Sequence, residues 1–223
     1  MSIPVPETLK RKRLPTAERQ QEIIAVALEL ARTISPEGIT TQAIADHVGI
    51  THGALFKHFP DKQALWFAVF EWVHVQLGTV IRQGFQDEGD ALTRLQQVFL
   101  AHVGFVARHP GAPRILFYEL QQTKDSPFQE RARGTLGAYR QRLCELFKEA
   151  SRSGQLSPTL DAKMAAMLFI GTIQGLVMQS ALFRSEAEML VAAKRLFPLL
   201  LDGFRGNVQE KPVSEPTCEH HEK

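Results

Sequence analysis

Apolar residues recur every three or four positions along nearly the whole chain, and this helical period constrains the fold more than any other feature. After Thr16, the apolar residues fall on one stripe: Ile23, Ile24, Ala27, Leu28, Ala31 and Ile34. No pair of alternating apolar runs flanks an Asn-Gly or Asp-Gly turn, so nothing indicates a β-hairpin. The sequence therefore predicts an all-α fold of about nine helices.

Capping side chains and helix breakers mark where these helices begin and end. Thr16, Thr40 and Thr51 are expected to cap the first three helices, and Gly49 offers a left-handed turn at the end of the second. Ser185 and Glu188 have the spacing of a capping box for the last helix. We expect helices over about residues 16–34, 41–48, 52–58, 61–83, 91–107, 113–122, 127–153, 161–183 and 186–203.

Composition divides the chain into four parts. Residues 1–14 form a Pro-containing basic arm, residues 15–62 carry three shorter helices, and residues 63–206 carry the longer ones. Residues 207–223 are polar and Pro-containing, which predicts a disordered tail. Cys218, His220 and His221 in that tail could ligate a transition metal, but adjacent ligands in a flexible segment seldom make a selective site. We therefore expect no metal and no cofactor.

The overall composition is that of a globular chain, since 44% of the residues are apolar, 22% are charged and the formal net charge is +2. Two cysteines are too few for a disulfide framework or a thiolate zinc site. No apolar segment follows the first charges, so no secretion signal is expected. The stretch from Met164 to Phe183 carries no charge, but Gln174 and Gln179 favour a helix buried in protein over a membrane span. We expect a cytoplasmic protein.

The segment from Thr40 to Lys62 carries the clearest functional pattern. Two short capped helices joined through Gly49 make a helix-turn-helix, whose second helix fits the major groove of DNA. Small residues at Gly53 and Ala54 would let that helix approach the groove closely. From spacing alone, a plain corner of an all-α core remains an open alternative.

The residues of this segment resemble the DNA-binding domain of the tetracycline-repressor (TetR) family. The resemblance covers residues 16 to about 70 without a gap. The matching elements are the apolar repeats from Ile23 to Ala31, Gly38, Thr40-Thr41, Ile44-Ala45, Gly49-Ile50-Thr51, Gly53, Leu55-Phe56-Lys57-His58-Phe59 and Lys62-Gln63-Ala64-Leu65. It implies a three-helix DNA-binding domain followed by a larger helical domain that binds an effector and dimerises.

The resemblance also implies roles for single residues. Thr41 and Gln42 would meet a phosphate or a base edge, and Thr40 and Thr51 would cap their helices. His52, Gly53 and Ala54 would face the bases. Backbone contacts are expected from Phe56, Lys57, His58 and Lys62. Phe56 departs from the family, which more often has Tyr at this position, and so lacks a hydroxyl for a phosphate.

Charge is unevenly distributed along the chain, so the small net charge of +2 is not evidence against DNA binding. Residues 1–15 carry +3, through Lys10, Arg11, Lys12 and Arg13, whereas residues 16–62 carry −2. The arm is expected to reach an adjacent minor groove or to follow phosphates. A solvated arm without a role is the alternative.

The later helices indicate a dimer face. Gly171 and Gly175 lie four apart in an apolar helix, a spacing that suggests close approach of another helix. The resemblance implies a two-helix dimer face, for which we expect Leu168, Gly171, Gly175, Ala181, Leu182, Leu190 and Phe197. A core within one chain is the alternative.

The resemblance places an effector pocket between the middle helices and the dimer pair. Candidate lining residues are aromatic, thioether or polar: Phe99, His102, Phe105, Phe117, Tyr118, Gln121, Met164, Met167, Phe169 and Met178. Such a wall suits an apolar or aromatic small molecule, oriented by His102, Tyr118 or Gln121. Taken singly, residues of these kinds are more often plain core.

The sequence thus predicts a homodimeric, ligand-responsive regulator, expected to be a repressor of a pseudo-palindromic DNA operator. It contains no Gly-rich phosphate loop, no His-Glu-x-x-His and no Gly-x-Ser-x-Gly, so no enzymatic activity is expected. The alternative is an all-α small-molecule binding or scaffold protein whose hairpin does not bind DNA.

Overall fold

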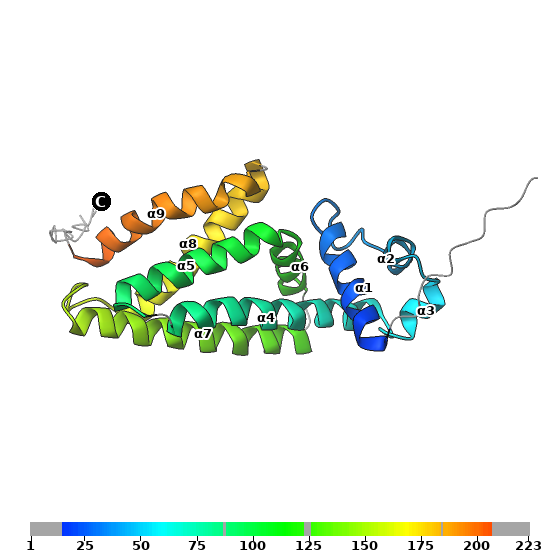
Figure 1. The fold of residues 1–223 in the computed structure, drawn as a ribbon, viewed down its shortest axis with the longest axis horizontal. Coiled ribbons are helices and arrows are strands. Elements are labelled where there is room, and N and C mark those ends of the chain that lie inside the picture. Colours follow the sequence, from blue (N-terminus) through cyan, green and yellow to red (C-terminus); the bar gives the residue numbers. More distant parts are fainter. Residues whose placement is uncertain (1–14, 87, 123–125, 184, 207–223) are drawn as a thin grey trace, which may run out of the picture.

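The computed structural model describes residues 15–86, 88–122, 126–183 and 185–206, and the secondary structure within them is entirely helical (Figure 1). The expected basic arm and C-terminal tail lie outside these described residues. The helices are α1 (Thr16–Leu30), α2 (Thr41–Val48), α3 (His52–Phe56), α4 (Lys62–Gln86), α5 (Ala91–Arg108), α6 (Gly111–Leu120), α7 (Pro127–Arg152), α8 (Ala162–Phe183) and α9 (Met189–Phe204), with a 3-10 turn, η1 (Glu186–Glu188), before α9. The prediction of an all-α fold is confirmed.

Several expected helix ends are wrong: α1 ends at Leu30 and not near residue 34, and α6 begins at Gly111 and not at Pro113. Two of the expected caps are wrong as well. Pro15, not Thr16, occupies the N-cap position of α1, and Thr16 is the first helical residue. The capping box at Ser185 does not form, because η1 intervenes and Glu188 precedes α9 without a side-chain cap. Pro15 suits this position because its fixed φ leads the chain into a helix.

The N-terminal core joins α1, α2 and α3 to the first turns of α4. Ile23, Ile44, Leu55 and Leu65 are fully buried within it. The core continues past residue 62, where the sequence suggested a boundary, and includes Trp66 and Val69 of α4, besides Ala112 and Ile115 of α6. α4 thus begins in the N-terminal core and continues into the larger bundle.

The larger bundle is built around a cluster of aromatic side chains. Phe99 packs against Phe169 and Phe197, with ring centroids 5.2 Å apart in both pairs. Phe147 packs edge-on against Phe169 and Phe204. Rings in this arrangement bury a large apolar area and also gain from their quadrupoles. This cluster holds α5, α7, α8 and α9 together.

α6 lies between the bundle and α1 (Figure 1). Its N-terminal residue, Gly111, approaches the backbone of α1 so closely that a Cβ there would overlap the Leu28 carbonyl oxygen and lie 3.1 Å from the Ala31 Cβ. Arg114 of α6 donates to the Arg32 carbonyl just beyond α1. A glycine is therefore required where α6 meets α1.

Two helices, α4 and α8, are long and apolar enough to cross a membrane by length and composition alone. That evidence is weak, because core helices of soluble proteins meet the same criterion. Both helices pack against neighbours in the bundle: α4 against α5, and α8 against α7 and α9. Within the most apolar window of each helix, 28% of α4 and 33% of α8 is buried in this single chain, so packing within the chain covers only part of their apolar surface.

Replacing Gly111 by Ala tests the close contact between α6 and α1. Overpacking at a backbone contact costs about 1–3 kcal/mol, so Gly111→Ala should lower the free energy of unfolding by that amount. Gly134→Ala is the matched control, because a Cβ on that glycine within α7 meets nothing within 4 Å. The control should be neutral or stabilising by up to about 1 kcal/mol in denaturant unfolding. Equal stability of the two variants would contradict the packing described.

Candidate DNA-binding interface

The α2–α3 hairpin is shaped by two side-chain caps and one glycine. Thr40 Oγ1 accepts a hydrogen bond from the Ala43 N–H at 3.0 Å, and Thr51 Oγ1 accepts one from the Ala54 N–H at 3.1 Å. Gly49 ends α2 in the left-handed region, with φ of 73°. Both threonine caps and the glycine turn are confirmed. They turn the chain so that the start of α3 faces outward while Leu55 packs into the core.

His52 is oriented by its neighbours. Thr41 Oγ1 and His52 Nε2 form a hydrogen bond of 2.8 Å between α2 and α3. The His52 ring also packs edge-on against Phe56, at 4.7 Å between centroids. Thr41 and His52, which were both expected to contact DNA, are therefore bonded to each other, and the imidazole is oriented in the absence of DNA.

Small and exposed groups surround His52. Gly53 and Lys57 are exposed, Ala54 is half-buried, and Phe56 is 39% exposed. A Cβ on Gly53 would meet nothing within 4 Å, so the surface there is open. This face of α3 is narrow enough to enter a groove and has an aromatic ring at its edge.

Other expected contacts already have partners within the chain. Gln42 Nε2 donates to Asp46 Oδ1 at 2.7 Å. His58 is half-buried, and its Nδ1 is buried without a hydrogen-bond partner among the described residues. Its carbonyl accepts a hydrogen bond from Gln20 of α1. His58 thus packs beside α1, which favours a structural role over a phosphate contact.

Lys62 also binds within the protein. Its Nζ donates to the Glu37 carbonyl at 3.0 Å and lies 5.8 Å from the centroid of the Trp66 ring. Burial lowers the pKa of Lys62, while the charges of Glu37 and Glu119 act to raise it. This ammonium faces the protein, although the sequence led us to expect a phosphate contact.

Most of the cations in the described part of the N-terminal unit have a partner within the protein. Arg19 pairs with Glu22 at 2.5 Å, and Arg32 pairs with Glu29 at 3.0 Å. With Lys62 engaged as well, exposed Lys57 is the cation best placed beside α3. The positive charge of the interface on these described residues is therefore small.

The expected effector residues do not line one wall. Phe99, Phe105 and Phe169 are buried in the bundle, whereas Met164, Met167 and Met178 are about half exposed on α8. Phe117 and Tyr118 are half-buried on α6, and Gln121 is exposed just beyond its end. α8 is apolar on most of its sides, so the helical period could not show which side faces the bundle.

His102 has a partner that the sequence did not indicate. Its Nδ1 lies 3.3 Å from the hydroxyl of Tyr139, which comes from α7. Burial lowers the pKa of His102 to about 4 and raises the pKa of Tyr139, so both side chains are neutral near pH 7. Tyr139 lies one turn before buried Leu143, a spacing that could have revealed it.

Only some of the residues expected on the dimer face are exposed. Leu168 and Leu182 are 53% and 72% exposed on α8, Ala181 is also exposed, and a Cβ on Gly171 or Gly175 would meet nothing within 4 Å. Phe197, however, is 2% exposed and belongs to the aromatic core, so its placement on the dimer face is wrong. Leu190 is half-buried against the same core.

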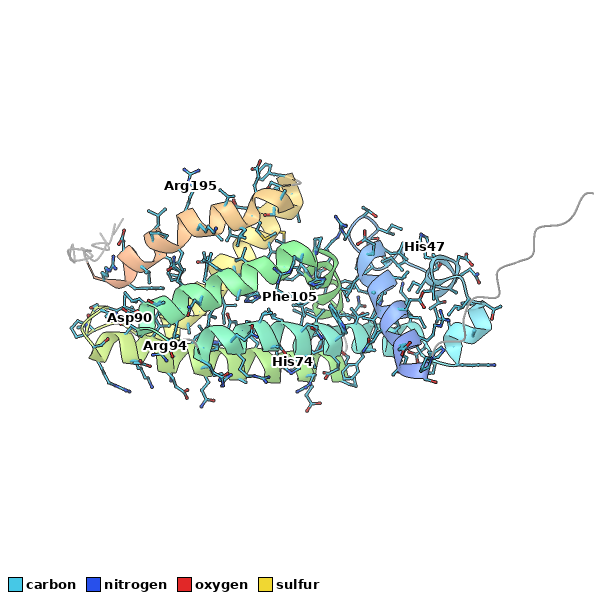
Figure 2. The ribbon with its side chains drawn as sticks, in the orientation of Figure 1. His47, His74, Asp90, Arg94, Phe105 and Arg195 are labelled. Carbon is cyan, nitrogen blue, oxygen red and sulfur yellow. The ribbon has the colours of Figure 1, made fainter. Side chains whose placement is uncertain are left out.

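A different side of α9 faces outward. Ala192, Arg195 and Leu199 line a shallow groove together with Gly175 and Gln179 of α8. Arg195 lies on the outer side of α9 (Figure 2). This side could not be predicted from the sequence, because exposed Val191 and Leu199 are apolar like buried Phe197, so apolar residues do not mark a single side of α9.

Comparison with known proteins identifies the family to which this architecture belongs. Residues 23–69 match the bacterial regulatory proteins of the tetR family, and residues 91–196 match the tetracyclin repressor-like C-terminal domain. The chain belongs to the tetR family. The matched segments include α2 and α3, so the hairpin described above is the DNA-binding element of a tetR-family transcriptional regulator.

Relatives of this tetR-family regulator include nucleoid occlusion factors. The nucleoid occlusion factor SlmA of Photobacterium profundum is 28% identical over 161 residues, covering 72% of this chain and 82% of the relative. SlmA of Klebsiella pneumoniae is 28% identical over 179 residues, covering 80% and 89%.

Solved structures share the fold at lower identity. The fatty acid degradation regulator FadR of Bacillus halodurans superposes with a TM-score of 0.73 at 20% identity, covering 87% of this chain and 99% of that one. The ketosteroid transcriptional regulator KstR2 of Mycobacterium tuberculosis gives 0.71 at 19% identity, covering 84% and 95%. FadR of Bacillus subtilis in complex with stearoyl-CoA gives 0.70 at 20%, covering 82% and 98%.

Proposed function

We propose that this regulator represses transcription by binding a pseudo-palindromic DNA operator as a homodimer in the cytoplasm, and that a small molecule releases it. The observation that carries the proposal is the capped α2–α3 hairpin, which presents the oriented His52 beside exposed Gly53. His52, Gly53 and Ala54 face the bases, while Thr41, Gln42, Phe56 and Lys57 contact the edges and the backbone. We assign the chain no catalytic role.

The basic arm adds phosphate contacts to those of the α2–α3 hairpin. Arg19, Arg32 and Lys62 are bound to groups of the protein itself, which leaves Lys57 beside α3. Affinity for DNA depends strongly on phosphate neutralisation. The next cations before Arg19 in the sequence belong to the arm, outside the described residues: Lys10, Arg11, Lys12 and Arg13.

Deleting residues 1–13 tests the role of the arm. The shortened protein should bind all DNA sequences more weakly by similar factors, because phosphates carry no sequence information. The slope of log affinity against log salt should fall by about 0.9 for each phosphate that the arm neutralises in the intact protein. Fluorescence anisotropy over a range of salt concentrations measures this slope. An unchanged slope would show that the arm does not touch DNA.

The exposed side of α8 and α9 is the dimer face. Apolar side chains that a monomer would leave in water gather there, including Met167, Leu168, Leu182 and Leu199. Gly171 and Gly175 let a second copy of α8 approach closely. Pairing of the two helices with their copies across a two-fold axis gives a four-helix interface. Two α3 helices spaced about one DNA turn apart then read two half-sites.

Placing a charge on this face should separate the dimer. Leu182→Glu introduces a carboxylate at a side chain that is 72% exposed in one protomer. Burying it unpaired in the dimer is costly, so the variant should sediment as a monomer at micromolar concentration. Leu136→Glu is the control, because Leu136 is a 41% exposed residue of α7, outside this face. Dimers of both variants, or a monomeric unsubstituted protein, would contradict the assignment.

The effector site is centred on His102 and Tyr139. Both groups are neutral and lie between α5 and α7 among apolar side chains, with Phe85 of α4 at 6.3 Å from the Tyr139 ring. They suit an apolar molecule that carries one uncharged hydroxyl or carbonyl group. The likeness to a FadR in complex with stearoyl-CoA supports including acyl thioesters among the candidates.

Selection of DNA fragments from the source genome tests the function as a whole. The full-length protein should retain specific fragments with pseudo-palindromic sites, and compounds added to the complex should include one that releases them. His52→Ala should abolish the selection. Retained sites next to promoters support repression, whereas sites spread over the chromosome favour the role named by the SlmA relatives. Compound binding without fragment retention would favour the alternative of a ligand-binding protein that does not bind DNA.

A further inference from the structure

The bond between Thr41 and His52 joins the start of α2 to the start of α3. Thr41 Oγ1 and His52 Nε2 lie 2.8 Å apart, and the imidazole ring packs edge-on against Phe56. The other ring nitrogen, His52 Nδ1, has no hydrogen-bond partner among the described residues and is not buried. The adjacent Gly53 leaves open space, since a Cβ there would meet nothing within 4 Å. One imidazole nitrogen is therefore held by the protein, and the other is available to a base.

Thr41 lies at a helix end that favours an anion. It is the first residue of α2, and the side chain of Thr40 already occupies the Ala43 N–H. The remaining N–H groups of the first turn and the helix dipole attract negative charge. The next residue, Gln42, is turned toward Asp46. The Thr41 hydroxyl is then a donor that the start of α2 offers to a DNA phosphate.

The hydroxyl of Thr41 has a single proton, which limits what His52 can do. A phosphate oxygen only accepts hydrogen bonds, so a Thr41 hydroxyl bound to phosphate donates its proton there. Oγ1 can then only accept from His52, which places the imidazole proton on Nε2. In a neutral imidazole with its proton on Nε2, Nδ1 has a lone pair and acts as an acceptor.

We propose that Thr41, by binding a phosphate, sets the tautomer of His52 so that Nδ1 accepts a hydrogen bond from an amino group on a base edge in the major groove. The proposal rests on the proposed binding of DNA. In the major groove, cytosine presents an amino group, adenine presents an amino group beside an acceptor, and guanine and thymine present only acceptors. An accepting His52 therefore favours cytosine or adenine at the base that it meets. The opposite tautomer, with the proton on Nδ1, favours guanine.

Base-pair substitution in the operator tests which group His52 reads. The probe is a duplex that carries a site recovered by genomic selection, and wild-type binding to it is measured first as the test of the proposed function. Each base pair of one half-site is then changed in turn. Wild type and His52→Ala are compared by fluorescence anisotropy at low salt, where phosphate contacts keep the variant bound.

The position that His52 reads is the one where a change weakens binding of the wild type but not of His52→Ala. We expect cytosine or adenine there, favoured over guanine by about fivefold or more. A preference for guanine or thymine at this position would show that Nδ1 donates and would overturn the proposal. The absence of any such position would overturn it as well, while leaving the binding of DNA established.

Variants of Thr41 separate a positioning role from a simple phosphate contact. Thr41→Val removes the hydroxyl with little change of shape, so either nitrogen of His52 can carry the proton. The preference for the amino-bearing base over guanine should then fall toward unity, whereas Thr41→Ser keeps the hydroxyl and should keep the preference. Weaker binding of Thr41→Val to all duplexes by one common factor, with the preference intact, would show a phosphate contact alone and overturn the proposal.

Base analogues keep the proposal testable on the wild type if Thr41→Val does not fold. Deoxyzebularine in place of deoxycytidine, or deoxynebularine in place of deoxyadenosine, removes the amino group at the position that His52 reads. The wild type should bind the altered duplex about fivefold or more weakly, and His52→Ala should bind both duplexes equally. The variant also controls for the weaker base pair that the analogue forms. Unchanged affinity of the wild type would overturn the proposal.

Discussion

The packing of α6 into the N-terminal core is the contact on which the rest of the structure depends. Gly111 brings the start of α6 against the Leu28 carbonyl, and Ala112 and Ile115 fill space between α1 and α4. Because α4 also runs from this core into the larger bundle, the two parts are joined by two helices and not by a flexible linker. α4 and α6 are therefore the helices that connect the bundle to the N-terminal core.

Electrostatics explain why a regulator of DNA can have so small a net charge. Residues 16–62 carry −2 in total, and within them Arg19 and Arg32 are paired with glutamates one turn away. The structure leaves one face of α3 nearly neutral, with a small, oriented reading surface at its start. Such a surface suits base recognition, whereas long-range attraction to DNA has to come from elsewhere in the chain.

Local signals in the sequence predicted the hairpin well. Thr40, Gly49 and Thr51 each act on backbone groups within a few residues, so their roles follow from short-range geometry. Tertiary packing decided the rest. The sequence did not show which side of α9 Phe197 occupies, and the structure places it in the aromatic core against Phe99. Lys62 donates to the carbonyl of Glu37, which lies 25 positions earlier, a contact that no local pattern indicates. The Ser185 capping box failed because the chain forms a 3-10 turn between α8 and α9.

The central claim is that two copies of α3, held by a dimer of the larger domains, read DNA together. Hydroxyl-radical footprinting of the full-length protein on its selected site tests this most directly. We expect two equivalent protected regions on one face of the duplex, centred about 10 base pairs apart or a multiple of that spacing. A single protected region, or two regions on opposite faces of the duplex, would contradict it.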